Sequence, residues 1–573
     1  MARANNEVAA LLQELADLLT ITGGDAFKVR AYEKAVRAIS GHPEDVGELG
    51  LAGLKKIPSV GDAIAKKILD YQRTGTIRQV EDLRAQIPAG VRTLTDIPTL
   101  GPKKAMALYE ELGVDSVAGL EEAVRAGRLR GLKGFGEKTG ENILRGIAIM
   151  AQSADRFPID TAMEIAERIV ATLERVPGAV RCAYAGSLRR MRETIGDIDV
   201  LVASEDPGPI METFVSMPQV TDVIARGDKK TSVRTFRGPQ VDLRVVPPES
   251  WGAALQYFTG SKEHNVRIRE RAVRAGLKLS EYGLFEAGSG ELIVSSTEEE
   301  VYERLGLPWI PPTLREDDGE IEAALEGGLP ALVRVEDLRG DLHSHTDLTD
   351  GRATLEEMAA AAAERGLEYY AITDHAPNLR MHRMTDEKML AQREALRTLQ
   401  ERHPEMALLH GTELNIAPDG GVDWPAEFLD GFDVCVASVH SHFTQDVEEM
   451  TRRFVTACEN PHVNIIGHPT ARAIGRRPRV EADWDEVFEA CARTGTALEI
   501  NSFPDRLDLP ADLVRRAKRH GVRFAVDTDA HAVAHHRNIR YGLGTAQRGW
   551  LTPDDVINTW PLDRLRRFLD KGR

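Results

Sequence analysis

Three aspartates in the middle of the chain have the type and spacing of a metal-binding site. Asp197 and Asp199 lie two residues apart in the run GDIDVLVAS, whose apolar residues alternate as in a strand, so both carboxylates leave the same face. Asp242 has the matching place in a later strand-like run, QVDLRVV. Converging carboxylates repel one another unless cations lie between them, and two Mg²⁺ ions there would activate an attacking oxygen and stabilise a leaving pyrophosphate. The pattern therefore predicts phosphoryl transfer.

Residues suited to binding phosphate precede these aspartates. Gly186 and Ser187 follow a strand-like run, and Arg190 comes shortly after them. Glycine lets backbone N–H groups approach a triphosphate, while the hydroxyl and guanidinium groups add donors and positive charge. A lone Asp-x-Asp pair is common on exposed strands, but its combination with Gly-Ser and a third strand aspartate favours a phosphoryl-transfer site.

A second set of candidate ligands lies in the last part of the chain. Fourteen of the 16 histidines lie at or after His343, and six of them recur with three carboxylates at the ends of strand-like runs. The C-terminal ends of the strands of a (β/α) barrel face one mouth, so we expect these groups to converge. The predicted ligands are His343, His345, Asp350, His375, Glu413, His440, His468, Asp529 and His531.

This donor set predicts hydrolysis of phosphoesters. Nine N and O ligands exceed the need of one ion and suit two or three Zn²⁺, Mn²⁺ or Fe ions, and without thiolates zinc is not singled out. Such ions turn bound water into hydroxide near neutral pH and hold phosphate oxygens. We expect the pairs His343/His345 and Asp529/His531 each to alternate on one strand face. His442 and Arg472, near the predicted mouth, are candidate phosphate contacts.

The elements that must position these groups indicate several domains. The 573 residues correspond to about three to five domains of ordinary size. Residues 160–315 combine strand-like runs with helical stretches, as in an α/β fold. Residues 339–573 alternate short apolar strands with helices over a length close to the roughly 250 residues of a (β/α) barrel. Prolines, paired glycines and an acidic run at 316–338 predict a linker.

The first 150 residues contain a weak threefold repeat. LKKIPSVGDAIAKKI, LTDIPTLGPKKAMAL and LRGLKGFGEKTGENI each place a tight glycine turn before a helix with lysines in its first turns. This is the pattern of helix-hairpin-helix motifs, in which exposed N–H groups at a helix N-terminus bind a DNA phosphate without reading sequence. The expected DNA-binding glycines are Gly61, Gly101, Gly134 and Gly136. A single copy could equally be a packed helical turn; three in succession favour DNA binding.

Composition excludes several other classes of protein. The four cysteines have no CxxC spacing, which argues against a disulfide scaffold or thiolate zinc finger and fits a reducing cytosol. No apolar run is long enough to span a membrane, and the start of the chain has the pattern of an amphipathic helix, unlike a secretion signal. The net charge is −17, but residues 316–573 hold 46 acidic and 31 basic residues, so the acidity does not argue against DNA binding by the first part.

On these motifs, residues 1 to about 315 resemble the family X DNA polymerases, the group that contains DNA polymerase beta. The resemblance implies that Asp197, Asp199 and Asp242 bind two Mg²⁺ ions, with Asp242 next to the primer 3′-OH. It also covers the segment YFTGSKEHNVRIRE. It implies phosphate binding by Arg156, Gly186, Ser187 and Arg190, sugar contacts by Tyr257, Phe258 and Gly260, a base contact by Asn265 and a template contact by Arg269.

The front of the chain resembles the lyase domain of the same family. Lys67 falls where a lysine attacks the sugar aldehyde of an abasic site and forms a Schiff base. Ala63 stands at a position that is usually basic, and Ser59 replaces a turn glycine. A plain phosphate contact by Lys67 is an equal alternative.

Residues 339–573 resemble the polymerase and histidinol phosphatase (PHP) domain, a distorted (β/α)₇ barrel, with all nine ligand positions filled. Together the resemblances imply a bacterial DNA-repair enzyme that fills short gaps in primed DNA with deoxynucleoside triphosphates and trims 3′ ends with Mn²⁺ or Zn²⁺. The PHP part could also nick abasic sites. The alternatives are a purely structural barrel and a small-molecule phosphatase. We expect a cytoplasmic, nucleoid-associated monomer.

The expected domains follow from these matches. They are a helical lyase-like domain at 1–85, a helix-hairpin-helix domain at 86–150, a palm at 151–250, a thumb-like domain at 251–315, a linker at 316–338 and a PHP domain at 339–573.

Overall fold

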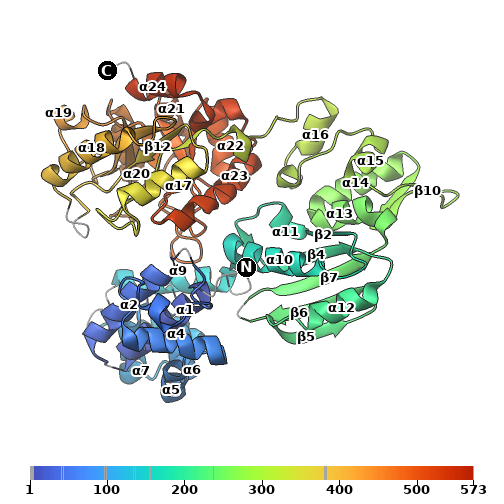
Figure 1. The fold of residues 1–573 in the computed structure, drawn as a ribbon, viewed down its shortest axis with the longest axis horizontal. Coiled ribbons are helices and arrows are strands. Elements are labelled where there is room, and N and C mark those ends of the chain that lie inside the picture. Colours follow the sequence, from blue (N-terminus) through green and yellow to red (C-terminus); the bar gives the residue numbers. More distant parts are fainter. Residues whose placement is uncertain are drawn as a thin grey trace.

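The helical N-terminal part, a central sheet with its attached helices, and a barrel follow one another along the chain (Figure 1). The computed structural model describes residues 5–22, 24–40, 42, 44–95, 97, 100–132, 135, 137–153, 156–236, 238–379 and 384–571. No helix within these ranges combines the length and the apolar composition that crossing a bilayer requires.

The N-terminal part is built only from helices in the ranges described. Their apolar faces meet in one core that includes Leu12, Leu15, Ile68 and Leu108, all 2 % exposed or less. The helices are α1 (Asn5–Ile21), α2 (Ala26–Ser40), α3 (Leu51–Leu54), α4 (Asp62–Thr74), α5 (Arg78–Gln86), α6 (Ala89–Thr95), α7 (Pro102–Leu112), α8 (Val117–Arg125) and α9 (Glu137–Ser153).

Two of the predicted hairpins are described, and their turns differ from the expectation in one respect. Gly61 and Gly101 are the N-caps of α4 and α7, with φ of −78° and −71°, so neither needs the left-handed region. The positive φ of the first turn, 63°, belongs to Ser59 instead. A Cβ atom at Gly61 or Gly101 would meet nothing within 4 Å, so both helix N-termini are open to a close-approaching group. Gly134 and Gly136 lie outside the described residues.

A five-stranded sheet forms the centre of the molecule. Its order is β2-β4-β7-β6-β5, and β4 and β7 are parallel neighbours. Ile198, Val200 and Leu243 are buried in the core beneath the sheet, which explains the alternating pattern of these strands. The elements are β1 (Phe157–Pro158), α10 (Ile159–Leu173), β2 (Arg181–Tyr184), α11 (Gly186–Arg189), β3 (Thr194–Ile195), β4 (Asp197–Ala203), α12 (Pro207–Val215), β5 (Val220–Arg226), β6 (Lys230–Thr235) and β7 (Gln240–Val246).

A smaller α+β unit follows. Its antiparallel sheet has the order β10-β9-β8 and packs with its helices around buried Tyr302 and Ile268. The segment 316–338, expected as a linker, contains α16, whose Ile321 and Ala324 join the same core. The elements are α13 (Trp251–Thr259), α14 (Lys262–Arg274), β8 (Leu277–Ser280), β9 (Gly283–Glu286), β10 (Leu292–Val294), α15 (Glu298–Arg304) and α16 (Glu320–Leu325).

Residues 340–570 form a parallel barrel, as predicted. Its seven strands follow chain order, β11 to β17, and a bridge between Ser344 and Ala530 brings the first and last strands together. The strands are β11 (Gly340–Asp341), β12 (Tyr369–Ile372), β13 (Ala407–Asn415), β14 (Val434–Ser438), β15 (Ile465–Gly467), β16 (Ala497–Asn501) and β17 (Phe524–Asp527). The helices are α17 (Leu355–Glu364), α18 (Asp386–Gln400), α19 (Ala426–Leu429), α20 (Val447–Glu459), α21 (Trp484–Thr494), α22 (Ala511–Arg519), α23 (Ile539–Arg548) and α24 (Leu562–Asp570).

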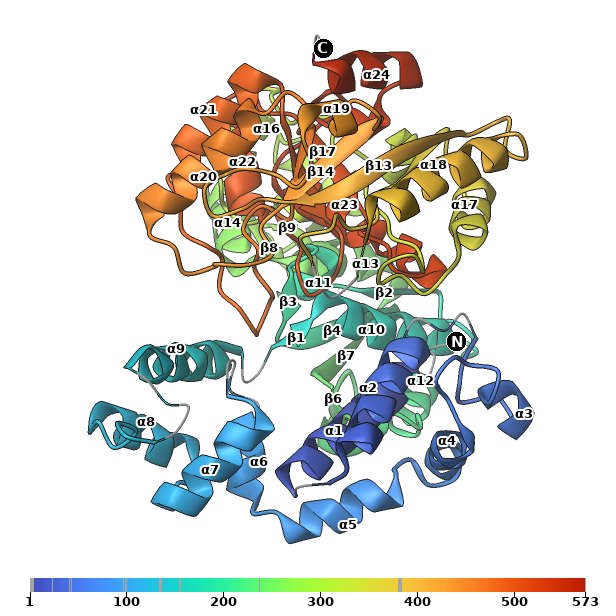
Figure 2. The same cartoon turned by 90° about the vertical axis from the view of Figure 1, so that its left-hand side faces the viewer.

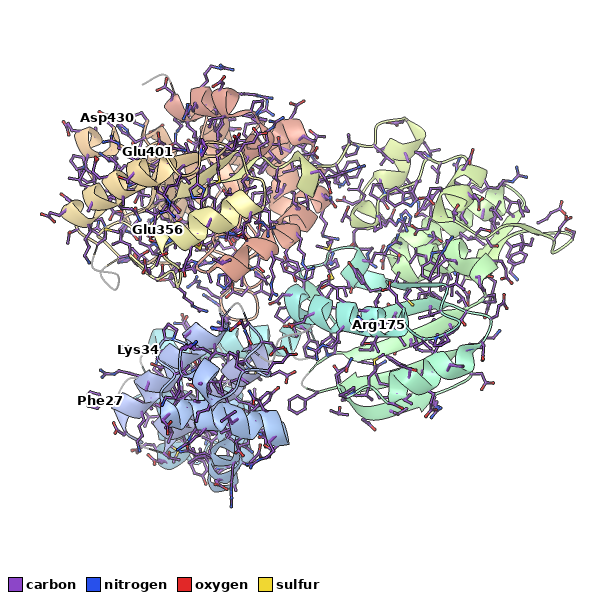
Figure 3. All side chains as sticks on the ribbon, viewed as in Figure 1. Phe27, Lys34, Arg175, Glu356, Glu401 and Asp430 are labelled. Carbon is purple, nitrogen blue, oxygen red and sulfur yellow. The ribbon has the colours of Figure 1, made fainter. Side chains whose placement is uncertain are left out.

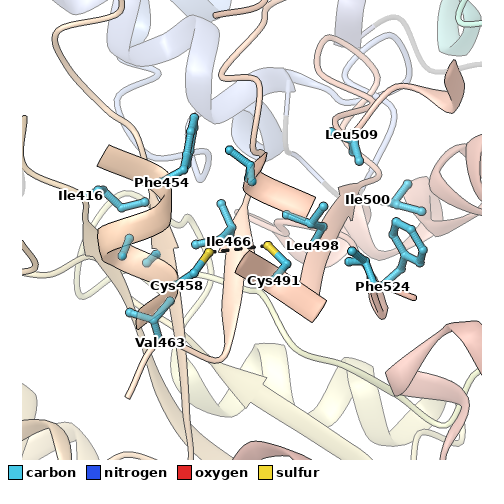
Figure 4. Packing of buried hydrophobic residues seen from close by; sticks show 14 of the residues in the cluster. Ile416, Phe454, Cys458, Val463, Ile466, Cys491, Leu498, Ile500, Leu509 and Phe524 are labelled. Atoms are coloured by element: carbon cyan, nitrogen blue, oxygen red, sulfur yellow. Dashed lines mark hydrogen bonds between the residues drawn. The ribbon is translucent and has the colours of Figure 1, made fainter. Parts of the chain in front are cut away.

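Apolar residues fill the space between the barrel strands and their helices. Figure 4 shows part of this packing, where Cys458 of α20 and Cys491 of α21 place their sulfur atoms 3.5 Å apart. Both are free thiols and both are buried, in agreement with the expectation that the cysteines do not form a disulfide scaffold.

The barrel and the central sheet share a core. Leu507 and Tyr541 of the barrel are buried in the same apolar cluster as Ile159 and Ala162 of α10. The backbone of α23 comes so close at Gly544 that an added Cβ atom would lie within 3.0 Å of the Met191 side chain. The two halves are therefore packed together rather than joined by a flexible tether.

Candidate active sites

The three aspartates of the central sheet lie on one face of neighbouring strands. Asp197 and Asp199 belong to β4 and Asp242 belongs to β7, and the parallel register pairs Asp199 directly with Asp242. Registered partners in a parallel pair point to the same side, and Asp197 lies two residues before Asp199 on that side. The arrangement that the spacing predicted is therefore present in the backbone.

The carboxylate of Asp199 is tightly enclosed. Burial and the nearby charges of Asp197 and Asp242 raise its pKa to about 7. Gly186, with φ +60°, brings the backbone so close that a Cβ atom there would lie 2.4 Å from Asp199 Oδ2. A divalent cation would remove the repulsion among the three acids, and no larger residue than glycine fits beside Asp199.

Asp242 forms an ion pair with Lys230. Burial would raise its pKa, but hydrogen bonds from Lys230, Gln240 and Ser232 together outweigh burial and lower it. Lys230 Nζ lies 2.8 Å from Asp242 Oδ2, and Gln240 Nε2 lies 2.8 Å from Oδ1. The sequence reasoning missed Lys230 because its position on β6 opposite β7 follows from strand pairing and not from a local motif.

The residues expected to bind phosphate come from segments that precede β4 in the chain. Arg190 donates to the carbonyl of Thr259 at 2.6 Å and to Glu316 Oε1 at 3.0 Å. Arg156 donates to the hydroxyl of Thr194 at 2.8 Å, three residues before Asp197. Ser187 follows Gly186 in α11, directly after the turn that approaches Asp199.

The residues expected to contact the nucleotide sugar and base come from α13, α14 and the turn between them. Tyr257 and Phe258 pack edge to face, with ring centroids 5.1 Å apart. Gly260 has φ +73°, and a Cβ atom there would lie 3.0 Å from a guanidinium nitrogen of Arg190. The backbone that follows the aromatic pair therefore packs closely against this arginine. Asn265 accepts from Gln256 at 2.8 Å and donates to the Tyr257 carbonyl at 2.7 Å.

Two further arginines, Arg269 and Arg244, make contacts with these residues. Arg269 is exposed, and its Nε lies 3.4 Å from the carbonyl of Asn265. Arg244 of β7 lies over the ring of Phe258, 4.4 Å from its centroid. Sequence reasoning missed Arg244, although its place two residues after Asp242 puts it on the same strand face.

Lys67 of α4 lies beside a cavity of about 570 Å³ that also contacts Ala63, Asp70 and Arg78. Burial lowers the pKa of its amine, and the nearby charge of Lys28 lowers it further, against the attraction of Asp70. A lowered pKa leaves a larger share of the amine unprotonated, which is what a nucleophile requires.

All nine expected ligands of the barrel come together at the C-terminal ends of its strands. Glu413, on β13, is the centre of the group: its carboxylate lies 2.8 Å from His375 Nδ1, 2.9 Å from His468 Nε2 and 3.1 Å from His440 Nε2. His343 Nε2 is 3.6 Å from the same carboxylate. A carboxylate with imidazoles around both oxygens is the arrangement that bridges two metal ions.

The remaining ligands extend the cluster. Asp350 Oδ2 lies 3.2 Å from His531 Nε2 and 3.4 Å from His375 Nε2. Asp529 Oδ1 lies 3.1 Å from His345 Nε2. The groups with metal-binding spacing are His345/Asp350/His375/His531, His343/His345/Asp529 and His375/Glu413/His440.

Two details of this site differ from the expectation. β11 ends at Asp341 and β17 ends at Asp527, so His343, His345, Asp529 and His531 lie in the loops after these strands and not on their faces. Asp529 has φ +50°, which no strand residue adopts. Arg472, an expected phosphate contact, instead donates to Glu193 of the central part at 2.7 Å.

Polar residues behind the ligands were missed by sequence reasoning. Glu499 Oε1 lies 2.6 Å from His343 Nδ1, and Asn415 Oδ1 lies 2.8 Å from His440 Nδ1. Asn501 donates to Asp529 Oδ2 at 3.0 Å. Such contacts fix the orientation of the ring and leave the opposite nitrogen for a metal. Glu499 and Asn501 could have been found from the sequence, because they lie at the polar end of TALEINS, the one predicted barrel strand to which no ligand was assigned.

The residues present fit divalent metals. The side chains of His343, Glu413 and Asp529 are all buried, and so much charge without cations would be costly. Among the described residues, Nδ1 of His345 is buried without a hydrogen-bond partner and lies 3.9 Å from Asp350 Oδ1, as expected for a nitrogen that faces a metal. The N and O donor set agrees with zinc, manganese or iron without selecting one.

Comparisons with known proteins match the chain segment by segment. Residues 3–77 match a helix-hairpin-helix domain, 91–148 a SAM-like helix-hairpin-helix tandem, 254–316 the DNA polymerase beta thumb and 341–503 the PHP domain.

Whole proteins are also similar. The chain is 35% identical over 569 residues, covering 99% of both proteins, to the DNA polymerase/3′-5′ exonuclease PolX of Bacillus subtilis. It is 25% identical over 340 residues to DNA polymerase lambda of Rattus norvegicus, covering 54% of this chain and 56% of the relative. The barrel part is 31% identical over 245 residues to a probable phosphatase of Thermoanaerobacter sp., covering 41% of this chain and 95% of the relative. The chain therefore belongs to the family X DNA polymerases, with helix-hairpin-helix segments, a polymerase beta-type thumb and a PHP domain.

Proposed function

We propose that this chain fills short gaps in DNA by adding nucleotides to a 3′-OH and trims 3′ ends at a separate site in its barrel. The pairing of Asp199 with Asp242 across two parallel strands, with Asp197 on the same face, is the observation that carries the first activity. Membership of the family supports both activities, because the Bacillus subtilis relative is named as a polymerase and a 3′-5′ exonuclease.

In nucleotide addition, different residues of the chain would have different roles. Mg²⁺ held by Asp197, Asp199 and Asp242 would supply the positive charge that favours a 3′-alkoxide and a leaving pyrophosphate. Arg190, fixed by Glu316, would hold phosphate oxygens in a defined direction. The turn at Gly186 would present backbone N–H groups to the same oxygens, with Ser187 and Arg156 adding donors.

Nucleotide selection is assigned to the α13–α14 turn. The deoxyribose would lie against Tyr257, Phe258 and Gly260, and the bulk of the aromatic side chains there would exclude a 2′-OH. Asn265 would contact the base and Arg269 the template strand. DNA phosphates would bind at the glycine turns of the three hairpins. These turns contain Gly61, Gly101, and Gly134 with Gly136.

The barrel performs hydrolysis in this proposal. Two or three Mn²⁺ or Zn²⁺ ions held by the nine ligands would supply hydroxide at neutral pH and hold the scissile phosphate. Glu499, Asn415 and Asn501 keep the ligand side chains in place. Removal of 3′ nucleotides, removal of 3′ blocking groups and incision at abasic sites all need this chemistry. We propose that the protein acts at the nucleoid in base excision repair, as a monomer with the five domains and one linker segment expected above.

One experiment tests both activities. Purified protein is incubated with a gapped duplex whose primer strand carries a 5′ label, under Mg²⁺ or Mn²⁺, with and without nucleotides. Lengthening with nucleotides and shortening without them support the proposal, and a strand of unchanged length under all conditions refutes it. Elemental analysis of the protein as isolated identifies the barrel metals.

Lys67 is proposed to form a Schiff base with an abasic-site sugar, with a plain phosphate contact as the alternative. Borohydride reduction in the presence of an abasic-site duplex would trap a covalent complex that Lys67→Arg lacks. Complex formation by Lys67→Arg, or none by the wild type, leaves the phosphate contact.

A second candidate function for the barrel is hydrolysis of small phosphate monoesters. The similarity to a probable phosphatase over nearly the whole length of that relative favours it. Faster turnover of sugar phosphates than of DNA 3′ ends would support this candidate over trimming.

A further inference from the structure

A cleft opens between the central part and the barrel, beside the metal-ligand cluster. Its volume is about 560 Å³, and its lining comes from one face of α10 and from two barrel segments, around Phe503 and along the 3-10 turn Val533–Asn538. In Figure 2 the central part, which includes α10, lies between the barrel above and the N-terminal helices below. Glu167 of α10 contacts Arg540 of the barrel. We infer that this cleft binds the 3′-terminal segment of a single DNA strand and leads it into the barrel mouth. The inference rests on the proposed 3′-end trimming and names the path by which the strand arrives.

The cleft reaches the ligands through an aromatic side chain. The ring of Phe503 is partly exposed and lies 6.5 Å from the ring of His531 and 5.1 Å from the ring of His535. His535 Nδ1 in turn accepts a hydrogen bond from the backbone N–H of His531 at 3.2 Å. A base stacked on Phe503 would therefore lie beside His531, one of the expected metal ligands.

Cations line the part of the cleft that would hold the rest of the strand. Arg168, Arg175 and Arg537 have no ion-pair partner among the described residues, so their guanidinium groups are available to phosphate. Arg175 follows α10 and is labelled in Figure 3. The acidic Asp160 and Glu164 lie nearer the start of α10, so charge changes from negative to positive along the helix.

The wall of the cleft is held together by an ion pair between the two halves. Arg540 of α23 lies 2.6 Å from Glu167 of α10, so neither is available to a ligand. This contact keeps Arg168, the next residue on α10, at a fixed distance from the barrel. Proteins that bind single-stranded DNA combine an aromatic side chain for base stacking with arginines for the phosphates. The cleft volume of about 560 Å³ is too small for a duplex.

The test uses the full-length protein and the variants Phe503→Ala, Phe503→Tyr and Arg537→Ala. Arg566→Ala, an exposed arginine on α24 outside the cleft, is the matched control. Removing the stacking ring should lower kcat/KM for 3′-nucleotide release from a single strand at least about tenfold, and Phe503→Tyr should restore it. Arg537→Ala should act in the same direction, more strongly at low salt.

A small substrate separates binding from chemistry. Hydrolysis of bis(4-nitrophenyl) phosphate needs the ions alone, so Phe503→Ala should leave it within about twofold of the wild type. Equal loss of both reactions would assign Phe503 to the metal site and overturn the inference. Loss of neither would place the strand elsewhere and also overturn it.

A crosslinking readout keeps the inference independent of the proposed hydrolysis. A single strand ending in 5-iododeoxyuridine is irradiated with the protein in EDTA, and the attached peptide is identified by mass spectrometry. Attachment at Phe503 supports the cleft even if no DNA is cut, in which case the trimming function alone fails. Attachment only outside the cleft-lining segments overturns the inference even if DNA is cut.

Discussion

Arg548 of the barrel helix α23 donates a hydrogen bond to the backbone carbonyl of Arg190 in the central part, at 3.0 Å. The same guanidinium nitrogen lies 2.7 Å from Glu316 Oε1, the atom that Arg190 Nε also contacts. A barrel residue therefore fixes both the backbone and the side-chain partner of an arginine expected to bind nucleotide phosphates.

Substitution of Arg548 by Ala should weaken nucleotide binding. Without Arg548, Glu316 and Arg190 lose a shared hydrogen-bond partner, so we expect KM for deoxynucleoside triphosphates to rise about fivefold with a smaller change in kcat. Arg548→Lys should recover part of the loss. Steady-state primer extension measures both constants, with Arg566→Ala as control. An unchanged KM in Arg548→Ala would show that the barrel contact does not orient Arg190.

Substitution of Asp242 by Asn should stop nucleotide addition and spare hydrolysis. The change keeps the size of the side chain and removes the charge that would hold a cation, so primer extension should fall at least about 100-fold. Asp222→Asn, an exposed aspartate on β5 of the same sheet, should extend normally. Extension by Asp242→Asn near the wild-type rate would place the reaction elsewhere.

Substitution of His440 by Ala should have the opposite effect. It removes one of the imidazoles around Glu413, so Mn²⁺-dependent shortening of 3′ ends should fall at least about 100-fold while extension persists. Bound metal, measured by elemental analysis, should also fall. His403→Ala, away from the cluster, is the control. Full metal content with full hydrolysis would contradict the assignment of His440 as a ligand.

Glu298 should make the stability of the central part depend on pH. Its carboxylate lies 2.6 Å from Arg315 and 2.7 Å from Arg189; burial would raise its pKa, but these two arginines outweigh burial and lower it to about 2. A lowered folded-state pKa adds stability that is complete above the unfolded value of about 4.5 and is lost as pH falls through about 2.

Glu298→Gln should therefore cost about 3 kcal/mol at pH 7 and progressively less below pH 4.5. Trp309, whose indole N–H donates to Glu298 at 3.1 Å, is one of six tryptophans, so the unfolding is measured by far-ultraviolet circular dichroism. Glu270→Gln, at an exposed position on α14, is the matched control. A constant difference between Glu298→Gln and the wild type from pH 7 to pH 3 would contradict the charge-based origin.

The sequence predicted most of both sites because each depends on local patterns. Asp197 and Asp199 share a face by strand alternation alone, and the barrel ligands follow strand-like runs whose ends must meet. Residues such as Lys230, Glu499 and Arg548 carry no local motif, since their roles depend on which distant segments become neighbours. The first hairpin shows a further limit: a glycine motif predicted the turn, but Ser59 takes the left-handed conformation.

The placement of Leu507 and Tyr541 inside the apolar cluster of the central part has a consequence for truncated proteins. A truncation that removed the barrel would expose the apolar residues of α10 that pack against Leu507 and Tyr541, so the central part alone should be less stable. The barrel therefore has two roles in this chain, because it holds its own ligand cluster and also covers apolar residues of the central part.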